Sequence, residues 1–176
     1  MIRGLQAATF LAVAAVAGIA GYYLSHTSFS SPASQAAARR LLRVPLAGLD
    51  GKKQVLVHQE GKILVVNFWA TWCPPCREEI PELIRIHRKY VANGVEVVGI
   101  AIDNADKVKV FASEMRVHYG LLIAGAETLA MSKDLGNEAG VLPFTVVLDR
   151  TRRVVYTHAG ALTEAALDAV LLPLLQ

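Results

Sequence analysis

The sequence predicts an α/β domain in which helices cover both faces of a central mixed β-sheet, preceded by one N-terminal transmembrane helix. Two observations carry this prediction. Beyond residue 44, short apolar runs rich in β-branched residues alternate with stretches whose apolar residues recur at helical spacing. Near the N-terminus lies a long uncharged apolar run. A chain of 176 residues has room for one domain of ordinary size and such an appendage.

The apolar run extends from Leu5 to Leu24 and explains a mean hydropathy of +0.38. About 20 residues of helix cross a hydrocarbon core of about 30 Å. Arg3 precedes the run, and no Lys or Arg occurs between residues 25 and 38. Because positive charge stays in the cytoplasm, we expect a single-pass anchor with a cytoplasmic N-terminus. The domain then lies on the periplasmic side of a bacterial inner membrane.

A cleaved signal peptide that ends around Ser34-Gln35-Ala36 is the alternative interpretation of this run. Its apolar region is usually about 7–15 residues, so the greater length here favours a retained anchor. Both alternatives deliver the domain to the same side of the membrane. We therefore expect an anchor over residues 1–25, a flexible tether rich in Ser and Ala over 26–43, and a folded domain over 44–176.

The charge excludes one class of partner. The 18 basic and 15 acidic residues give a net charge of +3, and no run of Lys or Arg alternates with aromatic residues. A nucleic-acid partner is therefore not supported. We expect a monomer that binds the inner membrane through residues 5–24.

Each element of the domain has its own signal. Glycine-lysine pairs bracket the first strand, and the second is a continuous apolar run, as expected of a strand buried on both faces. The first helix carries Ile80, Leu83, Ile84 and His87 at helical spacing, and Asn104 is a plausible cap for the second. The expected strands are 54–58, 63–68, 95–102, 121–124, 144–148 and 153–157, and the expected helices are 74–91, 105–115, 129–135 and 163–175.

The two cysteines, Cys73 and Cys76, form a C-x-x-C motif at the start of the first long helix. A structural zinc site needs about four ligands, and there is no further cysteine or close histidine pair in the sequence. Covalent haem attachment needs a histidine where Arg77 stands. An inert disulfide would close only a small loop and so restrain the unfolded chain little. A redox-active pair that needs no cofactor and no metal explains more of the neighbouring residues.

A helix N-terminus favours the reactive form of Cys73, because unpaired N–H groups and the positive end of the helix dipole stabilise a thiolate. Pro75 falls in the first turn, where the missing N–H costs nothing. Cys76 is close enough to attack a mixed disulfide formed at Cys73. Trp72 is expected to form a partly exposed aromatic wall beside the sulfurs.

The run Asn67-Phe68-Trp69-Ala70-Thr71-Trp72-Cys73-Pro74-Pro75-Cys76-Arg77-Glu78-Glu79-Ile80-Pro81 resembles the TlpA/ResA-like branch of the thioredoxin superfamily. The resemblance implies a thioredoxin-like fold and a redox-active Cys73–Cys76 disulfide. Val141-Leu142-Pro143-Phe144-Thr145 is similar to the family's second motif, a loop with a cis proline. From the residues alone we would expect Pro143 to be a trans proline at a strand entry, because only about 5–6% of X–Pro bonds are cis, and the resemblance reverses this expectation. The substrate-binding residues that the resemblance implies are Trp72, Pro74, Pro75, Leu142 and Pro143.

Asn67 stands where thioredoxin has a buried aspartate that handles protons. Another carboxylate must then assist, and Glu79, three residues after Cys76 on the same helix, is the candidate. The resembled reductases have a glutamate at that position. The alternative is a solvated glutamate like Glu78.

We expect a protein-disulfide reductase, because the Pro74-Pro75 spacer offers no side chain to stabilise a strongly oxidising thiolate. In the resembled branch a membrane thiol carrier supplies electrons, and the substrates are protein disulfides of cytochrome c maturation or of oxidase copper-site assembly. A disulfide oxidase on the same fold and a copper-binding metallochaperone that uses Cys73 and Cys76 are the alternatives. A peroxide-reducing enzyme is disfavoured by the adjacent C-x-x-C.

Overall fold

The computed structural model describes residues 31–56, 59 and 61–176. The predicted anchor, residues 1–25, lies outside these ranges, as does His58 at the end of the first predicted strand. Within them, no helix has both the length and the apolar character that crossing a membrane requires. The transmembrane helix therefore stays a prediction.

A seven-stranded mixed sheet forms the centre of the described part of the chain, in the order β2-β1-β5-β4-β3-β6-β7. The strands β3, β4 and β5 run parallel, whereas β6 runs antiparallel to β3 and begins the C-terminal hairpin with β7. The strands are β1 (Leu46–Gly48), β2 (Lys53–Gln54), β3 (Ile63–Trp69), β4 (Val95–Ile102), β5 (Gly120–Ala124), β6 (Phe144–Leu148) and β7 (Val154–Ala159).

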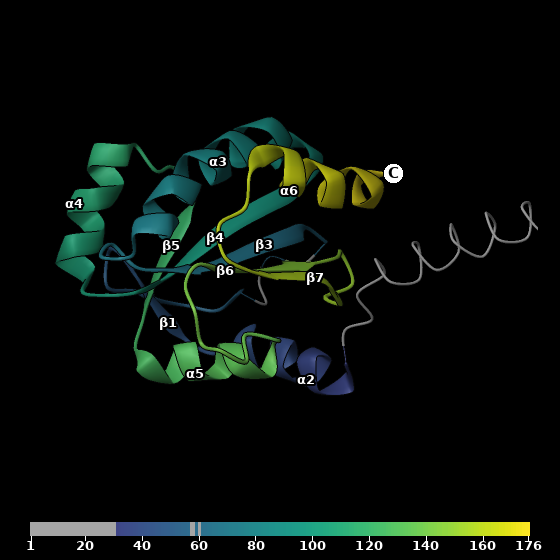
Figure 1. Ribbon diagram of the computed structural model, residues 1–176, viewed down its shortest axis with the longest axis horizontal. Helices are drawn as coiled ribbons and strands as arrows, with labels where there is room; N and C mark the ends of the chain where they lie inside the picture. The colour runs from purple at the N-terminus through teal and green to yellow at the C-terminus, as the bar shows by residue number, and fades with distance from the viewer. Residues whose placement is uncertain (1–30, 57–58, 60) are drawn as a thin grey trace, which may run out of the picture.

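Helices cover both faces of this sheet (Figure 1). One face carries α3 (Pro74–Tyr90), α4 (Ala105–Met115) and α6 (Glu164–Leu171), and the other carries α2 (Pro32–Leu41) and α5 (Ala126–Asp134). Alternate residues of β3 enter the two cores, Val65 on the α3 side and Val66 on the α2 side, and the whole strand is buried. This double burial is why β3 is a continuous apolar run.

The predicted flexible tether is corrected by α2, which lies inside residues 26–43. Ser31 caps this helix by accepting a hydrogen bond from the N–H of Ser34, at 3.1 Å. Ala37 and Leu41 are buried against the sheet, 2% and 1% exposed. The alanines that suggested a linker are also the strongest helix formers, and here their small side chains let the helix pack closely. The folded domain therefore begins before Val44.

Most other predicted elements are found, with four differences. The predicted strand 54–58 is reduced to β2 over Lys53–Gln54, and Val55 and Leu56 lie outside any strand. The strand β1 was not predicted, because its pairing partner β5 lies more than 70 residues away. The helix α5 starts at Ala126, three residues earlier than expected. The last helix ends at Leu171 and continues as a 3₁₀ turn over Leu172–Leu175, since Pro173 has no N–H for the helical ladder.

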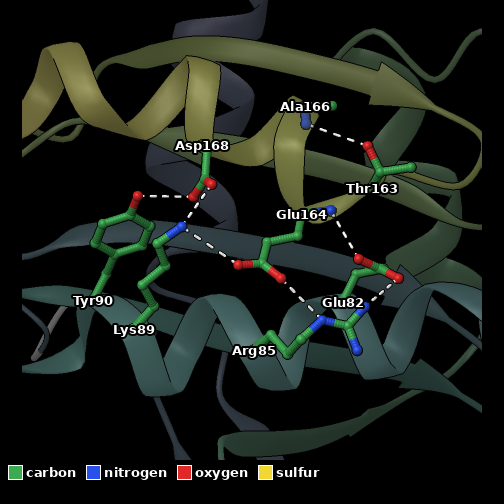
Figure 2. A network of polar contacts seen from close by, with 8 residues as sticks. All are labelled: Glu82, Arg85, Lys89, Tyr90, Thr163, Glu164, Ala166 and Asp168. Carbon is green, nitrogen blue, oxygen red and sulfur yellow. Dashed lines mark hydrogen bonds and ion pairs between the residues drawn. The ribbon is translucent and has the colours of Figure 1, made fainter.

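An ion-pair network joins α3 to α6 (Figure 2). Glu164 accepts a hydrogen bond from Arg85 Nε at 2.9 Å, and Lys89 Nζ lies 2.7 Å from Asp168 Oδ2. Arg85 also pairs with Glu82, which accepts a hydrogen bond from the backbone N–H of Glu164. Exposed pairs contribute little stability one by one. Together they fix where α6 begins over α3, and so where the loop before α6 lies.

Candidate functional site

The two cysteines lie where the central strand passes into α3. The strand β3 ends at Trp69, and Cys73 is the N-cap of a 17-residue helix. Cys73 Sγ accepts a hydrogen bond from the N–H of Cys76 at 3.3 Å. The two residues form a disulfide with their Cα atoms 5.3 Å apart, so the expected pairing is confirmed. One sulfur therefore sits at the positive end of the longest described helix.

The two cysteines of the disulfide differ in their exposure to solvent. Cys76 is fully buried, Cys73 is 4% exposed, and Trp72 is 65% exposed beside it. Pro74 and Pro75 are also exposed on the first turn of α3. Cys73 is thus the sulfur nearer to solvent, within a rim of exposed Trp and Pro side chains.

The turn that carries Trp72 is fixed by Asp103, a residue that was not predicted to belong to the site. Asp103 Oδ2 accepts hydrogen bonds from the N–H of Thr71 at 3.0 Å and from its hydroxyl at 2.5 Å. Burial acts to raise the pKa of Asp103, but the hydrogen bonds from Thr71 and Asn104 outweigh it and leave this pKa below its ordinary value. Its place at the carboxyl end of a central parallel strand was the available signal.

The second predicted motif forms a loop before β6. The Leu142–Pro143 peptide bond is cis, in agreement with the resemblance, and Leu142 packs against the core cluster that contains both cysteines. Asn137, which the sequence did not single out, holds this loop from beneath. Its side chain accepts from the N–H of Val141 at 3.0 Å and donates to the carbonyl of Val141 at 2.9 Å.

Glu79 lies on the buried side of α3, 1% exposed, whereas Glu78 is exposed. Its Oε2 accepts a hydrogen bond from Asn67 Nδ2 at 2.7 Å, and its Oε1 accepts one from the N–H of Leu162 at 2.9 Å. Burial raises the pKa of Glu79 to about 7, against the smaller lowering effect of hydrogen bonds from Leu162, Asn67 and Thr145. Such a carboxyl can take and release a proton near neutral pH.

Asn67 has a structural role that the sequence did not indicate. The sequence showed it only as a replacement for an aspartate, but its side-chain amide donates hydrogen bonds to Glu79 Oε2 and, at 2.9 Å, to Thr145 Oγ1. Leu162 was missed because the contact spans 83 positions and involves only its backbone. The site therefore joins β3, α3, β6 and the loop before α6.

No cluster of three or more His, Cys, Asp or Glu side chains is placed to hold a metal ion among residues 31–56, 59 and 61–176. That the protein needs no metal or other cofactor stays a prediction.

A disulfide capping a helix at the end of a central strand, in this α/β fold, defines the chain as a thiol–disulfide oxidoreductase of thioredoxin-like architecture. Comparison with known proteins narrows the class. Residues 28–171 match the Redoxin family, and the chain belongs to that family, in its TlpA/ResA-like branch of the thioredoxin superfamily.

Three similar proteins illustrate the relationship. The thiol-disulfide oxidoreductase ResA of Halalkalibacterium halodurans is 28% identical over 163 residues, which cover 90% of this chain and 89% of that protein. The thiol:disulfide interchange protein HelX of Rhodobacter capsulatus is 35% identical, covering 66% of this chain and 63% of the relative. The crystal structure of a thioredoxin-related protein from Neisseria meningitidis serogroup B is 37% identical, with a TM-score of 0.63, and covers 72% of this chain and 96% of that one.

Proposed function

We propose that the protein is a reductase of specific protein disulfides that works outside the cytoplasm. The observation that carries this proposal is the buried carboxyl of Glu79, whose pKa of about 7 suits proton exchange one helical turn from Cys76. The N-terminus of α3 is a second support, because it favours a thiolate at Cys73. Cys73 is then the nucleophile, Cys76 the resolving thiol and Glu79 the proton acceptor that disulfide exchange requires.

The reaction begins from the reduced protein. The Cys73 thiolate attacks one sulfur of the client disulfide, whose sulfur–sulfur bond breaks as the other sulfur leaves as a thiolate. Cys76 then gives its proton to the Glu79 carboxylate and attacks Cys73 Sγ, which breaks the bond between Cys73 and the client and releases the second client sulfur as a thiolate. The two client thiolates take up protons from Glu79 and from solvent, so the client leaves as a dithiol with two added electrons. The protein is left with the Cys73–Cys76 disulfide. Trp72 and the Pro143 loop position the client at Cys73.

Electrons flow towards the client in this proposal because the Pro74-Pro75 spacer adds no cationic or hydrogen-bonding side chain that would stabilise the reduced pair. A membrane thiol carrier recharges the protein on the periplasmic side of the inner membrane. The clients are disulfides of the kind reduced in cytochrome c maturation or in copper-site assembly. The similarity to ResA and HelX supports thiol exchange as the chemistry.

The proposal is tested by trapping the mixed disulfide. Cys76→Ser removes the resolving thiol, so the reduced variant should accumulate a covalent adduct between Cys73 and a client protein, visible on non-reducing gels. Cys73→Ser is the matched control and should form no adduct. A folded Cys76→Ser protein that forms no adduct with any extracytoplasmic disulfide protein would contradict the mechanism.

A redox titration against glutathione decides the direction of electron flow. A reductase should have a reduction potential near that of thioredoxin, about −270 mV. A value near that of DsbA, about −120 mV, would instead make the protein an oxidase.

A further inference from the structure

A cleft of about 440 Å³ lies beside the segment that carries the cysteines, between the first turn of α3 and the helix α4. Thr71 and Arg77 line one wall, and these two residues flank the Trp72-to-Cys76 segment in the sequence. Val110 and Phe111 of α4 line the other wall. The cleft therefore borders the segment that carries Cys73, against which a client must lie.

The sheet order places this cleft opposite the cis-proline loop. The strand β3, which leads to the cysteines, has β4 on one side and β6 on the other. The helix α4 follows β4, and the loop with Pro143 precedes β6 at the end where β3 finishes, since Phe144 pairs with Phe68. A client chain that crosses Cys73 thus meets the Pro143 loop on one side and this cleft on the other.

The walls of the cleft are held in place by contacts already present. Asp103 fixes Thr71 through two hydrogen bonds. The guanidinium of Arg77 lies over the ring of Phe111, 5.5 Å from its centroid, and this ring packs 5.3 Å from that of Trp69. The cleft is consequently pre-formed, which lowers the entropic cost of binding.

The chemistry of the cleft favours an apolar side chain. Val110 is 59% exposed, although it is a large apolar residue in the middle of a helix, and the buried Phe111 forms the floor. The charged residues of the rim are Arg77, Lys107, Asp106 and Glu114, two positive and two negative, so the rim favours no net charge. Val110 and Phe111 together give the cleft an apolar lining, which can accept an apolar side chain.

We propose that this cleft binds the client polypeptide by accepting an apolar side chain that lies within a few residues of the client cysteine. The inference rests on the proposed function and adds a specificity-determining surface to it. Since Cys73 is only 4% exposed, the client must lie closely against the protein on both sides of the attacked sulfur. Val110 supplies the apolar contact, and the charged rim hydrogen-bonds the client main chain.

The experiment uses full-length protein in mild detergent, reduced and freed of excess reductant. The substrates are two sets of peptides. Each peptide carries one cysteine joined to nitrothiobenzoate, with leucine in one set and serine in the other at a position two to four residues from that cysteine. A small disulfide without any peptide, the disulfide-linked dimer of nitrothiobenzoate, is the reference substrate. Val110→Asp is the test variant and Val110→Ala the milder one. Val91→Asp is the matched control, because Val91 is also exposed, at 44%, but lies beyond the far end of α3.

For the wild type, kcat/KM should be about tenfold higher for the leucine peptides than for the serine peptides, since burying part of a leucine is sufficient for that factor. Val110→Asp should remove this preference through KM, Val110→Ala should reduce it to about threefold, and Val91→Asp should leave it unchanged. None of the three variants should alter reduction of the small disulfide more than twofold.

The cleft inference fails if the wild type reduces both sets of peptides equally, or if Val110→Asp slows them equally. A failure of the proposed function looks different, because the wild type would then reduce neither set and Cys76→Ser would trap no adduct. Circular dichroism of each variant shows that the fold is retained, and Val110→Ala keeps the test valid if the aspartate disturbs α4.

Discussion

Replacing Glu79 by glutamine should change how the stability of the protein depends on pH. The carboxyl is 1% exposed, and its pKa is raised from 4.5 to about 7. Because folding raises this pKa, the native state binds more protons than the unfolded chain between those two values. The stability that Glu79 contributes is therefore fully present below pH 4.5 and is lost as pH rises to about 7.

The magnitude follows from the same two pKa values. At 1.36 kcal/mol per pH unit, the wild type should lose about 3 kcal/mol from this group between pH 4 and 8. Glutamine does not titrate, so Glu79→Gln is free of this loss. It does leave Asn67 or the Leu162 N–H without an acceptor, a cost of about 1–3 kcal/mol that is independent of pH.

Urea unfolding of the oxidised proteins in the same detergent, at several pH values from 4 to 8, gives the difference in free energy of unfolding. Other titrating groups cancel in this difference. Relative to the wild type, Glu79→Gln should gain about 3 kcal/mol over that range, nearly all of it between pH 4.5 and 7. A difference that stays constant to within about 0.5 kcal/mol, or that moves the other way, would refute a raised pKa at Glu79.

Three further predictions follow from other contacts. Leu41→Ala should lower the free energy of unfolding by about 2–5 kcal/mol, because Leu41 packs α2 into the core. A loss under about 0.5 kcal/mol would show that α2 is not part of the folded core. Asn67→Leu removes a hydrogen bond that lowers the pKa of Glu79, so the infrared carboxyl band of Glu79 should persist to higher pH than in the wild type. Asn104→Ala removes the cap of α4 and should cost about 1 kcal/mol in urea unfolding, with Asp106→Ala as a comparison that keeps the accepting side chain.

The sequence predicted well where local pattern and burial agree. The strand β4 and the helix α4 have the predicted bounds, and Asn104 caps α4 as expected. The placement of Glu79 on the buried side of α3 also followed from its spacing to Cys76. The predicted helix 74–91 extended to Val91, but this residue is exposed, because the helix ends at Tyr90.

What could not be predicted depends on contacts between distant parts of the chain. Asn137 supports the cis-proline loop, but an asparagine in a loop gives no sign of which carbonyl it will meet. The pairing of β1 with β5, and the backbone bond from Leu162 to Glu79, join segments more than 70 positions apart. The alanines of α2 fit both a linker and a helix, and only the apolar face of the sheet beneath them decides.

The helix α2 and the reactive cysteine lie towards opposite ends of the central strand β3. Gln35 exchanges two hydrogen bonds with the backbone of Val154, which pairs with Leu148 and, through it, lies level with Leu64 at the start of β3. Cys73 follows the other end of that strand, about 20 Å away for seven residues. The first turn of α2 thus lies towards the end of β3 that is remote from Cys73. An attachment at that end would leave the opposite end of the domain, which carries Cys73, accessible to client proteins.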